Sequence, residues 1–357
     1  MNRKIGIATF HYADNHGAVL QAYALRRVIN SFPDCQAEII NYVPRGYRYP
    51  VIPGNGMPES QKRKREKFNR FLAEQCGIHT PMIHSITGNV YDVYLVGSDQ
   101  VWNTELMEVS ADYEYFLPHL NEDAKRIAFS ASIGMDPQKI DNVFFKQYLS
   151  RFDSISLREK NCLEKISDLA GKKCEITLDP SMLLTAGDYE ALIEKPCIPE
   201  KPYLLYFWYD LGDGGMNSIE TVNTLARKYD LIVLHTFFSK GKVVRRMLVR
   251  DGGCMIQEGI EGFLWYIRNA QVIVTNSFHG AVFSLLFEKP LYIFYPEIRK
   301  SRQETLVELF RLQSRVIKGY VPLDRLNLEM DYSAISEIMQ KERKKSTDYL
   351  RSAIETA

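Results

Sequence analysis

The chain has 357 residues, more than one compact core usually holds, which predicts two domains. Its 45% hydrophobic and 25% charged residues are typical of a globular protein, and a formal net charge of +1 gives no general attraction to nucleic acid or anionic membranes. The six cysteines have neither CxxC nor CxxH spacing, and no apolar run reaches the roughly 20 residues of a membrane helix. These features argue against a zinc ribbon, a disulfide scaffold and a membrane-spanning protein, and we expect a cytoplasmic protein with reduced thiols.

The first half of the chain alternates strands with helices. It begins with a strand over 5–10, a polar turn over 11–17 and a helix over 18–29. Further strands are expected over 38–42, 91–96, 126–132, 153–157 and 175–178, and further helices over 61–74 and 161–169. Such alternation predicts a mostly parallel sheet. The segment 44–60 is rich in Pro, Gly and Tyr and predicts a surface loop.

The second half repeats this alternation. Three prolines between 196 and 202 predict a boundary that gives an N-terminal domain over 1–195 and a C-terminal domain over 196–330. In the C-terminal domain we expect strands over 203–209, 231–235, 272–275 and 291–295, and helices over 218–229, 262–270 and from 280. The charged segment 331–357 predicts a final helix that packs back on the first domain.

The stretch 272–295 contains the strongest functional signal, a strand, a polar turn, a helix and a second strand. His279 lies in the turn, and the letters His-Gly-Ala-Val that start there also occur at His16, after the first strand. Open α/β sheets bind ligands at the carboxyl ends of their strands, and a helix N-terminus favours anions. Two such units predict two Rossmann-like domains with a polar cleft between them. His279 either transfers a proton in that cleft or is a structural histidine.

Other strand ends carry polar groups whose roles have two readings each. Arg158 either binds a carboxylate or phosphate, or forms an ion pair with Glu159 or another acid. Asp99 either orients His279 or caps a helix, and Trp102 either lines a ligand loop or packs in the core. Together these groups suit acid–base transfer chemistry on an anionic substrate.

Several common catalytic motifs are missing. The sequence has no GxxxxGK[ST], no GxGxxG after the first strand, no HExxH and no GxSxG, which disfavours ATPases, dehydrogenases, metalloproteases and serine hydrolases. No DxD-type metal motif follows a strand, and we expect no metal site.

A set of short motifs, in order along most of the chain, resembles the polysaccharide pyruvyl transferase family. The motifs are Asn15-His16-Gly17-Ala18-Val19-Leu20-Gln21, Gly97-Ser98-Asp99-Gln100-Val101-Trp102-Asn103, Ile155-Ser156-Leu157-Arg158-Glu159, Leu178-Asp179-Pro180 and Thr275-Asn276-Ser277-Phe278-His279-Gly280. The resemblance implies a GT-B-like fold of two Rossmann-like domains. It also implies transfer of a pyruvyl group from phosphoenolpyruvate to a sugar of a cell-surface polysaccharide, such as an exopolysaccharide or capsule, with formation of a ketal and without a metal or other cofactor.

The implied catalytic residues are His279, Asp99 and Arg158. The implied substrate-binding residues are Asn15, His16, Gly17, Gln21, Ser98, Gln100, Trp102, Asn103, Asn276, Ser277, Gly280, Ser284 and Arg302. The sequence departs from the family at Ser277, where similar members often carry an arginine, so another cation such as Arg302 or Lys289 would have to hold the donor anion.

The implied partners are phosphoenolpyruvate and a saccharide acceptor, free or lipid-linked, with no nucleic acid. The basic residues of 62–67 form either a solvated helical face or a contact for phosphate headgroups, so membrane contact is at most peripheral, at the inner face. Two alternatives remain: a GT-B-like glycosyltransferase that uses a nucleotide sugar, and a catalytically silent sugar-binding protein of the same fold.

Overall fold

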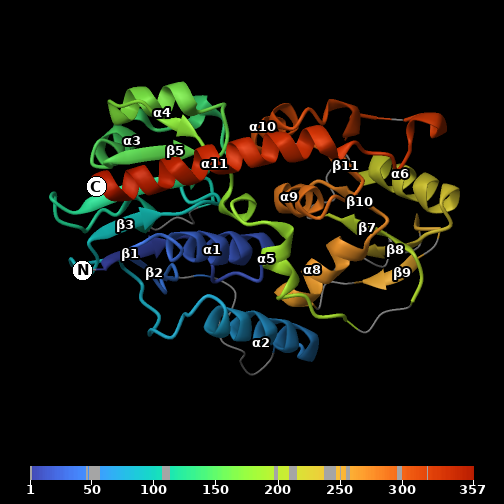
Figure 1. Cartoon of the computed structure of the whole chain (residues 1–357), viewed down its shortest axis with the longest axis horizontal. Helices are drawn as coiled ribbons and strands as arrows, with labels where there is room; N and C mark the ends of the chain where they lie inside the picture. The colour runs from blue at the N-terminus through green and yellow to red at the C-terminus, as the bar shows by residue number, and fades with distance from the viewer. Residues whose placement is uncertain are drawn as a thin grey trace. The chain divides into compact units, whose positions relative to one another are not determined.

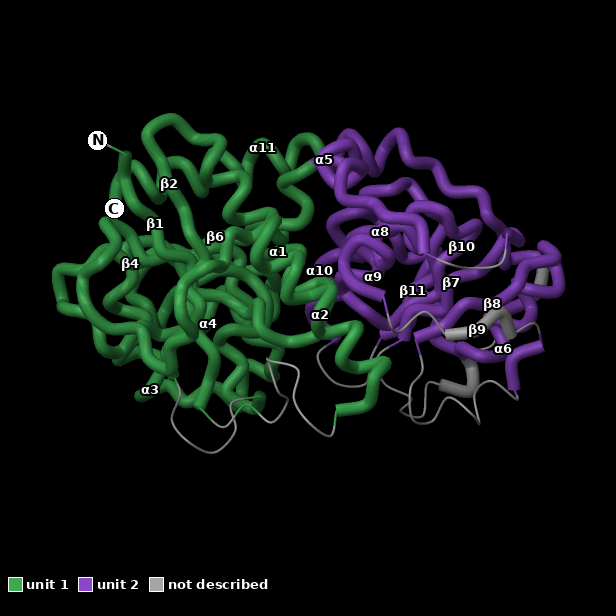
Figure 2. The backbone as a smooth tube through the Cα atoms, turned by 90° about the horizontal axis from the view of Figure 1, so that it is seen from below, with its two compact units in different colours: residues 1–184, 340–357 green, residues 185–339 purple. Residues whose placement is uncertain are grey.

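The structure is a computed structural model, and its described residues form two compact units (Figure 1). It describes residues 2–45, 47, 57–106, 113–196, 200–208, 215–236, 247–249, 251–254, 258–295, 300–319 and 321–357. Unit 1 comprises Met1–Leu184 and Gln340–Ala357, and unit 2 comprises Thr185–Met339, as Figure 2 shows in two colours. The predicted loop over 44–60 lies largely outside the described residues.

Unit 1 is built on a six-stranded sheet with the order β2-β1-β3-β4-β5-β6, in which every pair of neighbours is parallel. Its strands are β1 (Arg3–Ala8), β2 (Cys35–Ile39), β3 (Val93–Val96), β4 (Lys125–Ala131), β5 (Ser154–Leu157) and β6 (Glu175–Ile176). Its helices are α1 (His16–Ile29), α2 (Glu59–Glu74), α3 (Asn142–Leu149), α4 (Leu163–Ala170) and most of α11 (Tyr332–Thr356), with single 3-10 turns at η1 (Glu114–Phe116), η2 (Pro137–Lys139) and η3 (Pro180–Met182).

Helices cover both faces of this sheet, which explains its nearly continuous apolar strands. Phe145 of α3 and Ile166 of α4 join one buried cluster with Ala128 of β4. Successive strand residues point to opposite faces, so the next residue, Phe129, lies on the other face, where its ring meets Tyr349 of α11. Figure 1 accordingly shows α3 and α4 on one side of the sheet and α11 on the other.

Unit 2 repeats the design with the strand order β12-β11-β10-β7-β8-β9, again parallel throughout. Its strands are β7 (Tyr203–Phe207), β8 (Ile232–His235), β9 (Asp251–Cys254), β10 (Val272–Thr275), β11 (Leu291–Phe294) and β12 (Val316–Ile317). Its helices are α5 (Ala186–Glu190), α6 (Gly215–Lys228), α8 (Ile260–Asn269), α9 (Phe278–Leu286) and α10 (Ser301–Leu309), with 3-10 turns at η4 (Gln313–Arg315) and η5 (Leu323–Arg325).

The two faces of the second sheet are also covered. Val222 of α6 shares a buried cluster with Tyr206 and Val274, whereas Phe207, on the opposite face, packs its ring against Phe263 of α8 at 5.2 Å. Both sheets therefore have the Rossmann-like α/β form, and the predicted fold class is confirmed. The predicted cleft between the domains remains a prediction.

The units divide at Leu184, ahead of the three-proline segment that we took as the boundary. The reason is α5, which packs with unit 2: Tyr189 meets the ring of Phe283 at 5.1 Å, and Glu190 pairs with Arg268 at 3.0 Å. Residues 197–199 of that proline segment lie outside the described residues.

The C-terminal helix α11 contributes to unit 1 through its second part. Arg343 donates from Nε to the carbonyl of Met182 at 2.8 Å, and Ser346 Oγ accepts from the amide of Leu178 at 2.9 Å. Among the described helices, none has the length and apolar character needed to cross a membrane.

Candidate functional site at the carboxyl edges of two sheets

Each sheet reverses its strand order at one point. In unit 1 the chain passes from β1 to β2 in one direction and from β3 to β6 in the other, so the reversal lies between β1 and β3. In unit 2 it lies between β7 and β10 for the same reason. Crevices outside the carboxyl ends of strands at such points are where open α/β sheets bind ligands. We therefore expect the predicted site residues to lie at these two edges.

The first turn of α1 has structural tasks. Asn15 is its N-cap, and its Oδ1 accepts from the amides of Gly17 at 3.0 Å and Ala18 at 3.2 Å, which satisfies two helix-end donors. The buried ring of His16 packs on Phe68 of α2, with 5.1 Å between centroids. The predicted substrate-binding residues Asn15, His16 and Gly17 thus shape the start of the helix.

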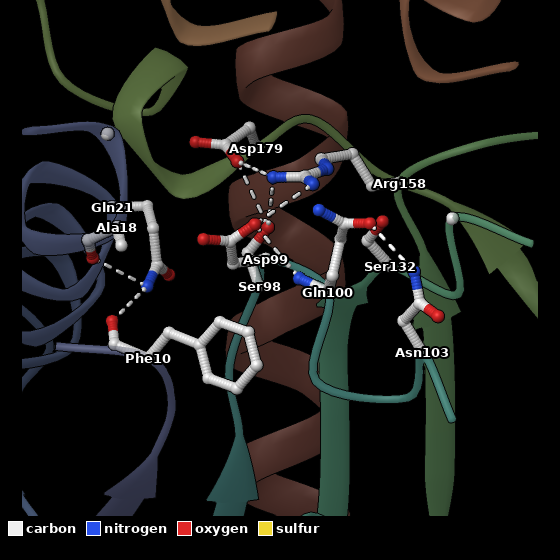
Figure 3. Close-up of polar contacts among 12 residues, drawn as sticks. Phe10, Ala18, Gln21, Ser98, Asp99, Gln100, Asn103, Ser132, Arg158 and Asp179 are labelled. Atoms are coloured by element: carbon white, nitrogen blue, oxygen red, sulfur yellow. Dashed lines mark hydrogen bonds and ion pairs between the residues drawn. The ribbon is translucent and has the colours of Figure 1, made fainter. Parts of the chain in front are cut away.

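Gln21 links α1 to the reversal point. Its buried side-chain amide donates to Thr9 Oγ1 at 2.9 Å and to the carbonyls of Phe10 and Ala18, as Figure 3 shows for the last two. Thr9 Oγ1 in turn donates to the carbonyl of Ser98 at 2.8 Å. This chain of hydrogen bonds ties the ends of β1 and β3 together.

Arg158 follows β5 and lies in a cluster of carboxylates. Its side chain is 1% exposed. Nη1 donates to Asp179 Oδ2 at 2.8 Å, Nη2 lies 3.5 Å from Asp99 Oδ1, and Nε lies 4.0 Å from Glu159 Oε2 (Figure 3). Burial opposes the charge on the guanidinium, but these carboxylates, Asp179 foremost, outweigh it and raise the pKa of Arg158 above its ordinary value. The ion-pair reading of Arg158 is thereby realised, with Asp179 as the nearest acid.

Asp99 is the most distinctive residue of this edge. It has a backbone φ of +71°, a left-handed conformation that is uncommon outside glycine and clusters at functional sites. The amide of Ser132, after β4, donates to its carbonyl at 2.9 Å. Its carboxylate accepts from the amide of Gln100 at 2.9 Å, and the side chain is almost fully buried. Local hydrogen bonds therefore hold Asp99 next to Arg158 in this uncommon backbone conformation.

The rest of the Gly97–Asn103 motif is buried. Trp102 is 0% exposed, stacks on Phe116 at 5.6 Å and donates from Nε1 to the carbonyl of Tyr115 at 3.0 Å. Asn103 Nδ2 donates to Gln100 Oε1 at 2.8 Å and is fully buried as well. The structure thus corrects the ligand-loop reading of Trp102: its large apolar ring is better satisfied in the core.

Glu159 anchors the next loop. Its Oε1 accepts from Ser132 Oγ at 2.9 Å and from the amides of Ile133 at 2.7 Å and Gly134 at 2.8 Å. Gly134 has a φ of +59°, which favours glycine, and a Cβ there would lie 2.5 Å from Gln100 Oε1. The carboxylate therefore fixes the loop after β4 against the end of β5.

In unit 2 the turn between β10 and α9 is tightly built. Ser277 is the N-cap of α9, and its Oγ accepts from the amide of Gly280 at 3.2 Å. A Cβ on Gly280 would lie 2.6 Å from Thr275 Oγ1 and 2.7 Å from the Phe207 ring, so helix and sheet approach too closely for any side chain. Ser284 is buried and donates back to the Gly280 carbonyl at 2.7 Å, a bond within the helix.

These contacts give the side chain of Ser277 a structural role as a helix cap. Its hydroxyl caps the helix that carries His279, and the amide of Gly280, an implied substrate-binding residue, donates to that hydroxyl. The His279 ring is mostly buried, at 7% exposed, and its edge meets the ring of Phe278 at 5.2 Å.

Arg302 and Lys289 lie at different places relative to this turn. Gln303, beside Arg302 in the first turn of α10, donates to the carbonyl of Asn276, so α10 begins against the end of β10. Lys289 follows the other end of the nine-residue α9, about 13 Å away along its axis. Arg302 thus belongs to the helix that contacts the turn, whereas Lys289 follows the far end of α9.

The structure joins four predicted residues of unit 1, Gln21, Ser98, Asp99 and Arg158, in one network, and places Asn276, Ser277, His279 and Gly280 in one turn of unit 2. The predicted action of Asp99 on His279 involves both units and stays a prediction. Sequence reasoning missed Thr9 and Gln303, considered Glu159 only as an ion-pair partner of Arg158, and gave Asp179 no role. Asp179 lies in the quoted Leu178-Asp179-Pro180 motif, and an acid in that motif was the available signal.

Among the described residues, no three His, Cys, Asp or Glu side chains are arranged to hold a metal ion. The edges instead offer a guanidinium among carboxylates in unit 1, and an imidazole at a helix N-terminus in unit 2.

A sequence profile of the polysaccharide pyruvyl transferase family matches residues 15–297. None of the curated proteins compared with the chain matches it. Among solved structures, the UDP-GlcNAc 2-epimerase from Neisseria meningitidis bound to UDP-GlcNAc has 8% identity and a TM-score of 0.51, with 99% of this chain and 100% of that chain covered.

Two further structures are similar to the same degree. The UDP-GlcNAc 2-epimerase from Methanocaldococcus jannaschii has 12% identity and a TM-score of 0.52, with 95% of this chain and 92% of that chain covered. UGT89C1 from Arabidopsis thaliana has 11% identity and a TM-score of 0.50, with 99% and 100% covered. At such low identity these likenesses concern the fold alone, which is GT-B-like.

Proposed function

This chain belongs to the polysaccharide pyruvyl transferase family, and we propose that it transfers the pyruvyl group of phosphoenolpyruvate to a saccharide acceptor and forms a ketal. The observation that carries the proposal is the family match over 15–297, because that range includes the polar carboxyl edges of both sheets. No metal or other cofactor takes part in the proposed reaction.

We assign the donor to the edge of unit 2. The N-terminus of α9 favours an anion, and His279 in its first turn is the candidate proton donor. Arg302 is the candidate cation for the donor carboxylate, since Gln303 fixes the start of α10 against Asn276. In this chain Arg302 would thus act in place of the arginine that related members carry at position 277.

We assign the acceptor to the edge of unit 1. The carboxylate of Asp99 would accept the proton of the attacking sugar hydroxyl, and Arg158, which is paired with Asp179, would balance the charge there rather than bind the donor. The contacts of Arg158 support this assignment. A guanidinium that already forms an ion pair with a carboxylate at 2.8 Å binds a further anion less strongly.

The proposed reaction forms two bonds from acceptor oxygens to C2 of phosphoenolpyruvate. His279 donates a proton to the C3 methylene, the acceptor hydroxyl oxygen bonds to C2, and its proton passes to Asp99. The second hydroxyl then bonds to C2 as the C2–O bond to phosphate breaks. Its proton returns to His279, and the proton on Asp99 leaves with the phosphate.

His279→Asn tests the role of the imidazole. Loss of a positioned acid–base group should lower kcat about 10²–10⁴-fold, measured as phosphate release from phosphoenolpyruvate in the presence of a capsule-type saccharide. His84→Asn is the matched control, because His84 is an exposed histidine of unit 1 whose Nδ1 lies 2.8 Å from the Val43 carbonyl. Unfolding of His279→Asn, with His84→Asn stable, would identify His279 as a structural residue.

Ligand-dependent thermal shifts separate this proposal from a nucleotide-sugar enzyme, an alternative suggested by the similar epimerase structure with bound UDP-GlcNAc. A ligand at a hundredfold excess over its Kd stabilises the folded state by about 2.7 kcal/mol. Phosphoenolpyruvate should raise Tm and UDP-GlcNAc should not. The reverse result would replace pyruvyl transfer with chemistry on a nucleotide sugar, and no response to either, without turnover, would favour a silent sugar-binding protein.

A further inference from the structure

Asp179 occupies a position in unit 1 that the acceptor chemistry does not explain by itself. It is a buried carboxylate at the start of η3, just after β6, and its two oxygens have separate partners. Oδ1 accepts from the amide of Ser181 at 2.9 Å, which holds the carboxylate to its own turn. Oδ2 accepts from Ser98 Oγ at 3.0 Å and from Arg158 Nη1 at 2.8 Å. One oxygen is thus anchored locally, and the other faces the guanidinium.

The contacts of Arg158 are unequal. Asp179 is at full hydrogen-bond distance, whereas Asp99 Oδ1 lies 3.5 Å from Nη2, at the limit of a hydrogen bond. Ser98 Oγ, 3.4 Å from Nη1, adds a weak contact on the Asp179 side. The guanidinium therefore lies closer to Asp179 than to Asp99, and Figure 3 shows its contacts with both carboxylates.

From this geometry we propose that Asp179 is a positioning residue, which holds Arg158 close enough to Asp99 to balance its charge but too far away to form a tight ion pair with it. The consequence follows from charge-assisted hydrogen bonding. A carboxylate in a short, two-point pair with a guanidinium has its lone pairs occupied and is a poor proton acceptor, whereas one at 3.5 Å remains able to accept. The proposal rests on the role assigned to Asp99 in the proposed function.

Without the Asp179 carboxylate, Arg158 would lose its nearest ion-pair partner. Arg158 would remain charged, buried and next to two carboxylates, and its strongest remaining partner would be Asp99. In Asp179→Asn the side chain keeps its size and can still accept from Ser181, but it no longer attracts Nη1 as an anion. We expect Nη2 to close on Asp99 to about 2.8 Å, the usual length of a charge-assisted hydrogen bond.

The test combines a crystal structure of Asp179→Asn with kinetics on the full chain. We expect kcat to fall about 10–100-fold, the usual cost of a misplaced catalytic group, with the KM for phosphoenolpyruvate changed less than about twofold. Glu114→Gln is the matched control, because Glu114 is also a buried carboxylate of unit 1 but is hydrogen-bonded to Ser85 and Ile86. It should retain wild-type kcat. If Asp179→Asn fails to fold, Ser98→Ala, which removes one contact of Asp179 Oδ2 and keeps the ion pair, gives a smaller loss of kcat in the same direction.

The outcomes distinguish the two proposals. The positioning role is overturned if Arg158 stays 3.5 Å from Asp99 in Asp179→Asn. It is also overturned if kcat falls no further in Asp179→Asn than in Glu114→Gln. Neither result contradicts the turnover of the wild-type protein. Wild-type protein that releases no phosphate from phosphoenolpyruvate overturns the proposed function. In that case the crystal structure of Asp179→Asn still decides whether Asp179 sets the position of Arg158.

Discussion

Gly280 offers the sharpest test of how the chain builds the turn that carries His279. In Gly280→Ala the new Cβ would stand 2.6 Å from Thr275 Oγ1 and 2.7 Å from the Phe207 ring. Thr275 Oγ1 cannot move away freely, because it donates to the Phe207 carbonyl at 2.7 Å and accepts from the amide of Ser277 at 2.9 Å. The start of α9 must therefore shift away from the sheet.

The expected cost can be estimated from three opposing contributions. Overpacking of this kind costs about 1–3 kcal/mol, and disturbing the Ser277 cap costs about 1 kcal/mol more. Alanine favours the helix over glycine by about 1 kcal/mol. The net loss is about 1–3 kcal/mol, which corresponds to a fall in Tm of roughly 3–10 °C for a unit of this size.

Thermal unfolding followed by circular dichroism measures the effect. Gly187→Ala is the matched control in the same unit, because its Cβ would meet only Thr185 Oγ1, at an ordinary 3.7 Å. It should leave Tm unchanged or slightly raised. Equal Tm values for the two variants would refute the argument that close packing requires glycine at position 280.

Three further predictions concern unit 1. Trp102→Ala should lower the free energy of unfolding by about 3–5 kcal/mol in a denaturant titration, because the ring is fully buried and hydrogen-bonded to Tyr115. A loss of activity without a loss of stability would instead support a ligand-binding role for Trp102. Asn15→Ala should cost about 1 kcal/mol in the same titration, and Asn15→Ser, another good N-cap, should recover most of it, whereas equal losses would exclude the cap. Burial lowers the pKa of His11 in the folded protein below its ordinary 6.5. As pH falls, the imidazole is therefore protonated in the unfolded chain before it is protonated in the folded protein. Stability should therefore be unaffected by this group above about pH 6.5 and decline below it, and Tm measured against pH should decline less in His11→Asn.

The order of the residues is enough to predict the alternation of strands and helices and the position of the polar turns. Val272–Thr275 and Tyr203–Phe207 are runs of β-branched and aromatic residues that favour strands wherever they lie, and Ser277 and Asn15 cap the following helices through contacts within a few residues. Such local preferences act over a single turn or strand, and they can be read directly from the residue order.

Elements supported by weaker local signals were placed less well. The second strand spans Cys35–Ile39 rather than 38–42, because its register is set by pairing with β1, where Cys35 lies opposite Arg3. The short α10 was not predicted at all, although its Gln303 holds the end of β10.

The partners of the polar side chains, in contrast, follow from the three-dimensional packing of the chain. Arg158 had Glu159 beside it in sequence and Asp179 on a separate strand end, and the fold gives the close contact to Asp179. Likewise Trp102 lies within a polar motif, yet its ring is fully buried in the core. The physical reason is the same in both cases: the energy of a buried charge or ring depends on which distant segments surround it, and those neighbours are set by the packing of the sheet and its helices.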